Sequence, residues 1–243
     1  MRLADLLFSQ GLGSRRECAA LISRGLVQVQ GQTLTDADAN LPVVEGFEFS
    51  VDGQVWPYHA LGLVMLHKPP GYECSRQPRD HASVLSLLPP PLRRRGVQPV
   101  GRLDQDTTGL LLLTDNGALI HRLTSPRHHV PKVYEVRTRH PVSQDLPLRL
   151  LAGVVLHDDP EPARATACQI TGEHTLRLTL TDGRYHQVKR MLAAAGNRVE
   201  GLHRSAFGAL QLPADLPAGA WRWLNEAERT QLSAAPGAPD GRD

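Results

Sequence analysis

Apolar residues in the first twenty-five positions recur at helical spacing. Leu3, Leu6 and Leu7 would share one face of a short helix, and the glycines that follow would end it. Ser14 and Glu17 stand three residues apart, which is the signature of a capping box at the start of a second helix. The pattern therefore predicts two short helices in succession.

Period-two alternation replaces helical spacing after these helices. Residues 27–32 alternate into a glycine turn and predict a hairpin, and alternation returns at residues 47–51. Residues 53–60 contain a Trp-Pro pair, and we interpret them as a linker. We accordingly place a domain boundary near residue 58.

Strand patterns dominate the remainder of the chain, with helical patterns between them. We predict strands at residues 64–66, 110–113, 132–138 and 176–180. An Asp-Gly turn would lead from the last strand into a helix over residues 185–195. This order of elements favours the α+β class. We expect a small α/β domain over residues 1–58, a mixed, mainly antiparallel β-sheet with flanking helices over residues 59–232, and a disordered tail over residues 233–243.

Composition narrows the class of protein. The 243 residues are 41% hydrophobic and 21% charged, which is typical of a soluble globular chain. The apolar runs, such as Leu63–Leu66, are far shorter than the roughly 20 residues that span a bilayer, and no secretory signal precedes them. Cys18, Cys74 and Cys168 are odd in number and far apart, which argues against a disulfide framework or a zinc finger. We expect a cytoplasmic protein with no membrane partner.

The net charge is only +2, but the charge is distributed unevenly. Residues 1–35 are basic, residues 36–60 carry five acids and no lysine or arginine, and three later segments are basic. Those segments are residues 68–102, 122–139 and 184–204. Basic clusters that converge in a fold bind polyanions, whereas clusters that stay apart are ordinary solvated surface. Charge alone leaves both interpretations open.

The densest polar cluster is the loop Gly101-Arg102-Leu103-Asp104-Gln105-Asp106-Thr107-Thr108-Gly109, which directly precedes a buried strand. Two carboxylates on such a loop are well placed to enter a cleft. The same aspartates would also suit a turn in which they cap backbone N–H groups. No further ligand stands at metal-binding spacing nearby, so we expect no metal site.

Two other segments carry side chains suited to nucleic acid. Residues 182–191 form a basic start to a helix, which suits either phosphate binding or an ordinary solvated face. Helical spacing there would place Tyr185 and Lys189 on one side, with His186 turned away from them. Tyr134 lies in a predicted strand beside basic residues, where a tyrosine either packs in a core or stacks on a base.

Four motifs in order along the chain together resemble the bacterial RsuA-type pseudouridine synthases. They are Lys68-Pro69-Pro70-Gly71, Gly101–Leu110, Lys132-x-Tyr134 and Gly183–Met191. The N-terminal helices and hairpin, with Ser14-Arg15-Arg16, are similar to an S4 RNA-binding domain. Residues 125–129 most resemble the enzymes of this family that act on small-subunit ribosomal RNA. His67 stands where the family commonly has asparagine, a departure that concerns only the local loop.

The resemblance implies an enzyme that isomerises uridine to pseudouridine. The ribose–N1 bond is broken and remade to C5 without redox change, so no cofactor is expected. Asp104 would either attack C1′ or take a ribose proton, and both routes stay open. Lys189 would keep Asp104 charged beside RNA phosphates, and Tyr134 would stack on the extruded uracil. The implied target is uridine 516 of the small-subunit ribosomal RNA.

The resemblance and the basic segments together predict RNA contacts from both domains. The predicted RNA-binding residues are Arg2, Ser14, Arg15, Arg16, Arg24, Lys68, Arg102, Arg127, Lys132, Arg184, His186, Gln187 and Arg190. We expect the acidic residues 36–60 to face away from the RNA. The expected partner is ribosomal RNA, free or within a partly assembled small ribosomal subunit, and the chain is expected to be a monomer.

Three other functions fit parts of the pattern. A pseudouridine synthase of large-subunit ribosomal RNA would carry the same motifs. A non-catalytic RNA-binding assembly factor would have no need of Asp104, Tyr134 and Lys189 together. A glycosidase-like hydrolase requires two carboxylates that face one another, and Asp104 and Asp106 on one loop do not establish such a pair.

Overall fold

The computed structural model describes residues 1–157 and 159–233, and its fold divides into two compact units. Unit 1 comprises Met1–Leu63, Leu88–Gln98 and Leu113–Asn116. Unit 2 comprises the other described residues. Three separate stretches of chain therefore build unit 1, which takes in residues on both sides of the predicted boundary near residue 58.

Unit 1 begins with the two predicted helices, α1 (Leu3–Ser9) and α2 (Arg15–Ser23). The apolar face of α1 is fully buried, as its spacing indicated. A complete capping box starts α2, because the Ser14 hydroxyl accepts a hydrogen bond from the Glu17 N–H and the Glu17 carboxylate accepts one from the Ser14 N–H. The hydroxyl of Ser14 is thus already engaged within the protein.

An antiparallel sheet covers these helices in the strand order β2-β1-β3-β4. Its strands are β1 (Val27–Val29), β2 (Gln32–Leu34), β3 (Glu48–Val51) and β4 (Gln54–Pro57). Two-residue turns with positive φ at both positions, Gln30-Gly31 and Asp52-Gly53, join its hairpins. Our interpretation of residues 53–60 as a linker is therefore wrong for β4. Proline is tolerated there because Pro57 ends an edge strand.

The helix α3 (Pro90–Arg95) packs against the end of α1 within unit 1. A Cβ atom at Gly11 would lie only 2.2 Å from the carbonyl oxygen of Pro91, so the two backbones meet at a glycine. Arg94 donates a hydrogen bond to the Leu12 carbonyl at 3.2 Å. The stretch Leu88–Gln98 is thereby an integral part of unit 1.

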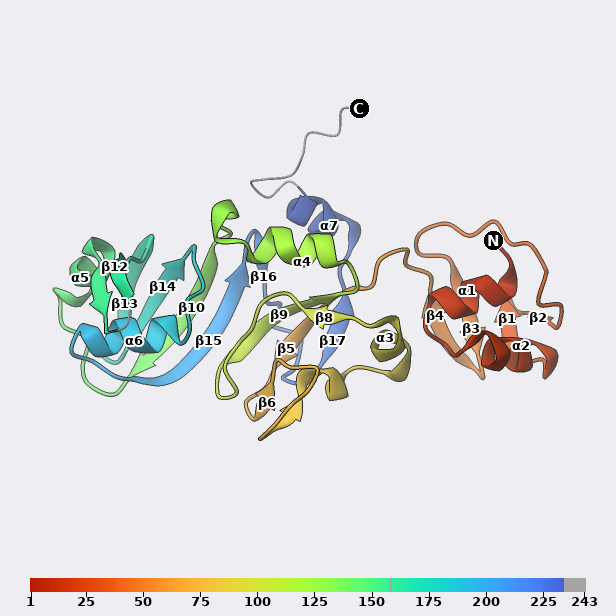
Figure 1. Cartoon of the computed structure of the whole chain (residues 1–243), viewed down its shortest axis with the longest axis horizontal. Helices are drawn as coiled ribbons and strands as arrows, with labels where there is room; N and C mark the ends of the chain where they lie inside the picture. The colour runs from red at the N-terminus through yellow and green to blue at the C-terminus, as the bar shows by residue number, and fades with distance from the viewer. Residues whose placement is uncertain (158, 234–243) are drawn as a thin grey trace, which may run out of the picture. The chain divides into compact units, whose positions relative to one another are not determined.

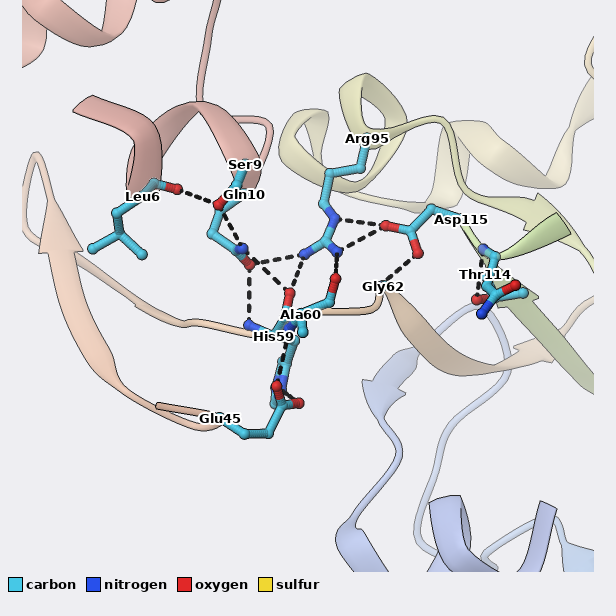
Figure 2. Close-up of polar contacts among 11 residues, drawn as sticks. Leu6, Ser9, Gln10, Glu45, His59, Ala60, Gly62, Arg95, Thr114 and Asp115 are labelled. Carbon is cyan, nitrogen blue, oxygen red and sulfur yellow. Dashed lines mark hydrogen bonds and ion pairs between the residues drawn. The ribbon is translucent and has the colours of Figure 1, made fainter. Parts of the chain in front are cut away.

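One buried side chain joins the parts of unit 1, as Figure 2 shows. Arg95, whose side chain is 5% exposed, pairs with Asp115 at 2.7 Å and donates to the carbonyls of His59 and Ala60. It also donates to the side-chain oxygen of Gln10, which accepts a second hydrogen bond from the His59 N–H. The segment after β4 is consequently held in place by hydrogen bonds and does not behave as a free linker.

The principal sheet has nine strands within the described residues, and its main path runs in the order β13-β14-β10-β15-β9-β5-β17. The strands on this path are β5 (Leu63–Lys68), β9 (Thr108–Thr114), β10 (Lys132–Thr138), β13 (Ala167–Gly172), β14 (Thr175–Leu180), β15 (Val199–Phe207) and β17 (Trp221–Trp223). The two others are β8 (Gln98–Pro99), beside β9, and β16 (Leu210–Gln211), beside β15. Strand β10 pairs antiparallel with both β14 and β15, whereas β15 and β9 are parallel. The α+β class and the mainly antiparallel sheet are confirmed, and all four predicted strands belong to this sheet.

The remaining elements flank this sheet (Figure 1). They are β6 (Tyr72–Glu73), β7 (Ala82–Ser83), β11 (Val154–Leu156), β12 (Asp159–Ala163), the 3-10 helices η1 (Val84–Leu87) and η2 (Pro126–His128), and the helices α4 (Gly117–Thr124), α5 (Leu146–Ala152), α6 (Gln187–Ala194) and α7 (Glu226–Ser233). The apolar face of α6 packs with residues of β10 and β14 in one buried core. Ser233 ends α7, and the rest of the predicted tail lies outside the described residues.

Among the described residues, no helix has the length and apolar character that a membrane crossing requires.

Candidate active site

A cleft of about 680 Å³ lies within unit 2, and the predicted motifs converge on it. Its lining includes the loop 101–106, residues 183–186 with Lys189, and side chains from β10 and β15. The cleft therefore brings together four segments that are far apart in the sequence. Asp104, Tyr134 and Lys189, the three predicted catalytic residues, all line it.

Two side chains contact the Asp104 carboxylate, one at each of its oxygens. Lys189 Nζ lies 3.2 Å from one oxygen, and His186 Nε2 lies 3.3 Å from the other. Lys189 also approaches the two oxygens of Asp106 at 2.6 and 2.9 Å. One lysine thus bridges two aspartates, and its charge is shared between them. Among the described residues, no group of three or more histidine, cysteine or acidic side chains is placed to hold a metal ion.

This bridge governs the ionisation of its members. Burial of Lys189 favours its neutral form, but hydrogen bonds to Asp106 and Asp104 outweigh burial and raise the pKa of Lys189. Burial of Asp106 likewise opposes its charge, yet the Lys189 hydrogen bond and charge hold the pKa of Asp106 below its ordinary value. Both groups are therefore charged at neutral pH.

Hydrogen bonds from Lys68 hold the backbone of the loop that carries Asp104 in place. This side chain is fully buried, and its Nζ donates to the carbonyls of Pro69, Gln105 and Thr107 at 2.8 to 3.1 Å. A side chain in this position cannot reach RNA, so the predicted RNA contact of Lys68 is wrong. Burial lowers the pKa of Lys68. The lysine instead holds two backbone carbonyls of the loop. That of Gln105 lies between the two aspartates, and that of Thr107 lies just before β9.

The helix α6 begins at Gln187, which places His186 at its N-cap in the left-handed conformation with φ of +48°. This sparsely populated conformation directs the imidazole toward Asp104, on the same side as Lys189. The prediction that His186 turns away from Lys189 is wrong, because it assumed that the helix began before His186. The Tyr185 ring stacks on the imidazole with centroids 3.8 Å apart.

Gln187 is buried, and both ends of its amide are engaged. Its oxygen accepts from the Arg184 N–H at 2.8 Å, and its nitrogen donates to the Asp182 carboxylate at 2.6 Å. Its predicted RNA contact is wrong for this reason, since the side chain braces the turn before α6. Arg184 itself pairs with Asp159 and Asp182, while Arg190 donates to the Tyr185 carbonyl.

Tyr134 enters the cleft from β10, and Arg204 stands directly opposite it on β15. Phe207 of β15 stands opposite Lys132, so these four residues form two cross-strand pairs that line the cleft. Lys132 Nζ donates to two backbone carbonyls, and burial lowers the pKa of Lys132. Sequence reasoning missed Arg204 and Phe207, because residues 199–207 lack a clear period-two pattern.

The other predicted RNA-binding arginines differ in how far they are engaged. Arg102, Arg127, Arg16 and Arg24 are exposed. Arg2 and Arg15 are exposed too, but Arg2 pairs with Asp5 and Asp38, and Arg15 pairs with Asp5 and lies over the Phe8 ring. Asp38, which belongs to the acidic stretch expected to face away from the RNA, thus lies beside a predicted RNA-binding arginine. Much of the positive charge of Arg2 is already balanced within unit 1.

Each of two parts of the chain matches a known protein family. Residues 62–194 match the family of RNA pseudouridylate synthases, and residues 1–43 match the S4 domain. The chain is 41% identical over 230 residues to ribosomal small subunit pseudouridine synthase A of Escherichia coli K12, covering 94% of this chain and 98% of the relative. It is 39% identical over 241 residues to the protein of the same name from Yersinia pestis, covering 96% and 99%.

A solved structure described as a pseudouridylate synthase shares the fold. Its TM-score with this chain is 0.68 at 33% sequence identity, and the match covers 96% of this chain and 99% of the other. The family match spans more than half of the chain, and it includes every residue that holds the Asp104 carboxylate. The chain belongs to the RNA pseudouridine synthases of the RsuA type, which isomerise uridine in RNA, and it carries an N-terminal S4 domain.

Proposed function

We propose that this enzyme converts one uridine of the small-subunit ribosomal RNA to pseudouridine, at uridine 516. The two curated relatives described above are named for the small ribosomal subunit, and each match covers nearly all of both chains. The observation that supports the chemistry is the Asp104 carboxylate, which Lys189 and His186 contact in a cleft of about 680 Å³. The monomeric state and the cytoplasmic location stay predictions.

Asp104 carries the reaction in this proposal. RNA that enters the cleft brings phosphate charge, which by itself would favour the protonated carboxyl group. Lys189 opposes this effect because it contacts Asp104 directly and is held charged by Asp106. The carboxylate therefore reaches the ribose ionised, ready to attack C1′ or to take a ribose proton.

Tyr134 receives the base in this proposal. A uridine within folded RNA must leave the stack before the carboxylate can reach its ribose, and unstacking costs a few kcal/mol. An aromatic ring that replaces this stacking recovers about 1–3 kcal/mol. Tyr134 lines the same cleft as Asp104 and is only partly buried, so its ring is available to the base.

Exposed arginines supply the phosphate contacts. Arg102 lines the cleft beside Asp104, and Arg127 is exposed in η2. In unit 1, Arg16 and Arg24 are the exposed arginines of the S4 fold whose charge is not taken up by an aspartate in the described residues. We therefore propose these four exposed arginines as the RNA contacts to test first.

Mapping of pseudouridine in both ribosomal RNAs tests the target. A strain that lacks the gene should lack one pseudouridine, at uridine 516 of the small-subunit RNA, and the wild-type gene should restore it. A gene that carries Asp104→Asn should not restore it, although the variant protein accumulates. Loss of a site in the large-subunit RNA would instead support the alternative substrate. An unchanged pattern in both RNAs would favour a non-catalytic assembly factor.

A further inference from the structure

A buried arginine on the floor of the cleft has a hydrogen-bonding group that the protein itself does not satisfy. Arg204 lines the cleft but is only 2% exposed, and its Nε donates to the Leu110 carbonyl at 2.9 Å. Its Nη2 is buried and has no hydrogen-bond partner within the part of the chain that the structure describes. Buried charged donors are normally paired, because an unpaired one loses its hydration without compensation. The unsatisfied group therefore indicates an acceptor that arrives with the substrate.

Strand register places this arginine beside the tyrosine that receives the base. Arg204 and Tyr134 are partners on the antiparallel strands β15 and β10, so their side chains project from the same face of the sheet. The register shifts between Val133 and Tyr134, which keeps both this pair and the Lys132–Phe207 pair on the cleft side. A base stacked on Tyr134 would thus have the Arg204 guanidinium at its edge.

Three contacts hold Arg204 in position. Its guanidinium carbon lies 5.2 Å from the centre of the Phe207 ring. Its backbone pairs with Gly109 of β9, where a Cβ atom would lie 2.3 Å from the Arg204 carbonyl oxygen. The side-chain bond to Leu110 anchors the guanidinium itself. A donor held this firmly loses little entropy when an acceptor binds, which is the condition for strong stabilisation of developing charge.

We propose that Arg204 Nη2 donates a hydrogen bond to a carbonyl oxygen, O2 or O4, of the extruded uracil. On either route for Asp104 the N1–C1′ bond breaks and its electron pair stays on the base, so negative charge spreads over N1, O2 and O4. The C5–C1′ bond then forms while the bond between Asp104 and C1′ breaks or, on the other route, while the ribose regains the proton that Asp104 took. A proton leaves C5, and N1 gains a proton. Arg204 stabilises the charged base between these steps. This inference rests on the proposed isomerisation in the same cleft.

Sulfur substitution in the substrate tests this contact directly. Single-turnover rates at saturating RNA would be measured with uridine, 2-thiouridine or 4-thiouridine at the target position, because sulfur is a weak acceptor. We expect one of the two thio substrates to react about tenfold more slowly than uridine with the wild-type enzyme. Arg204→Gln should lower the rate with uridine about 100-fold, with little change in RNA affinity. The same thio substrate should then cause no further loss.

A matched variant separates this effect from general damage. Arg229 of α7 also donates its Nε to a backbone carbonyl, that of Leu224, but lies outside the residues that line the cleft. Arg229→Gln should keep the wild-type rate and the full thio effect. Should Arg204→Gln fail to fold by thermal unfolding, Arg204→Lys replaces it and should show a smaller thio effect than the wild type.

Two outcomes would overturn the inference. One is a thio effect of equal size in the wild type and in the Arg204 variant for both thio substrates. The other is a wild-type rate for Arg204→Gln. Failure of the proposed function is a different result, because the wild-type enzyme would then form no pseudouridine from uridine itself.

Discussion

Each oxygen of the Asp104 carboxylate faces a different side chain, Lys189 on one and His186 on the other. These partners differ in kind. Lys189 carries its charge at neutral pH because hydrogen bonds to Asp106 and Asp104 raise its pKa, whereas His186 contacts Asp104 through a ring nitrogen. The lysine therefore supplies the permanent charge, and the histidine orients the second oxygen.

The substitution Asp104→Asn removes the charge and keeps the size of the side chain. We expect a folded protein that binds RNA and forms no measurable pseudouridine, because an amide can neither attack C1′ nor take a proton. Quantification of pseudouridine after reaction, with RNA binding and thermal unfolding as controls, checks this. Turnover at about a tenth of the wild-type rate or more would contradict the role of Asp104.

Two substitutions of Lys189 separate charge from geometry. Lys189→Ala leaves Asp104 and Asp106 without the cation that bridges them, so we expect turnover to fall at least about 100-fold. Lys189→Arg keeps the charge and should retain considerably more activity. Single-turnover rates at saturating RNA measure both variants. Equal losses in the two would show that position, and not charge, sets the requirement.

The sequence predicted which residues meet in the cleft more reliably than it predicted the roles of their polar neighbours. Asp104, Tyr134 and Lys189 converge on one cleft, as the motifs predicted. Lys68 and Gln187 were assigned to RNA because they are polar and lie in motifs, yet both are buried and bind the protein itself. Composition cannot reveal burial of this kind, since it depends on which backbone carbonyls the fold brings within reach.

At the scale of elements, the parallel pair β9–β15 places the Asp104 loop next to the floor of the cleft. Sequence patterns predicted β9 from its leucines but did not predict β15. Strand β15 carries glycine, histidine, arginine and serine among its apolar residues, and a register shift interrupts its pairing with β10. Tertiary contacts, and not local alternation, therefore determine this strand.

Gly109 is the residue on which this pairing depends. It has φ of +110°, and a Cβ atom there would lie 2.3 Å from the Arg204 carbonyl oxygen. Gly109→Ala should therefore lower the free energy of unfolding by more than about 2 kcal/mol. Gly117→Ala in α4 is the matched control, because no atom lies within 4 Å of the added Cβ, and it should leave stability unchanged or slightly raised. Chemical denaturation measures the free energy of unfolding of both variants. Comparable losses of stability in the two would contradict this explanation.

For the whole molecule, RNA affinity should depend on salt through the exposed arginines. Removal of one phosphate contact lowers the slope of log affinity against log salt by about 0.7–0.9. Arg16→Ala and Arg24→Ala should each produce such a change and leave the rate at saturating RNA nearly unaltered. The exposed Arg149 of α5 belongs to no predicted contact, so Arg149→Ala serves as the control. Binding titrations at several salt concentrations measure the slopes, and a collapse of the saturating rate would contradict a role in binding alone.

The contacts of Arg95 with Gln10, Asp115 and the carbonyls of residues 59 and 60 affect how the RNA-binding part of this protein can be exchanged between relatives. Gln10 and the carbonyls of His59 and Ala60 require a guanidinium that comes from a later stretch of the chain, and Asp115 comes later still. A chimera joined after residue 63 would take Gln10, His59 and Ala60 from one relative and Arg95 and Asp115 from the other. The buried arginine–aspartate pair would then lose its matched hydrogen-bond acceptors. The transplantable module is therefore discontinuous: the S4 fold must travel together with Leu88–Gln98 and Leu113–Asn116.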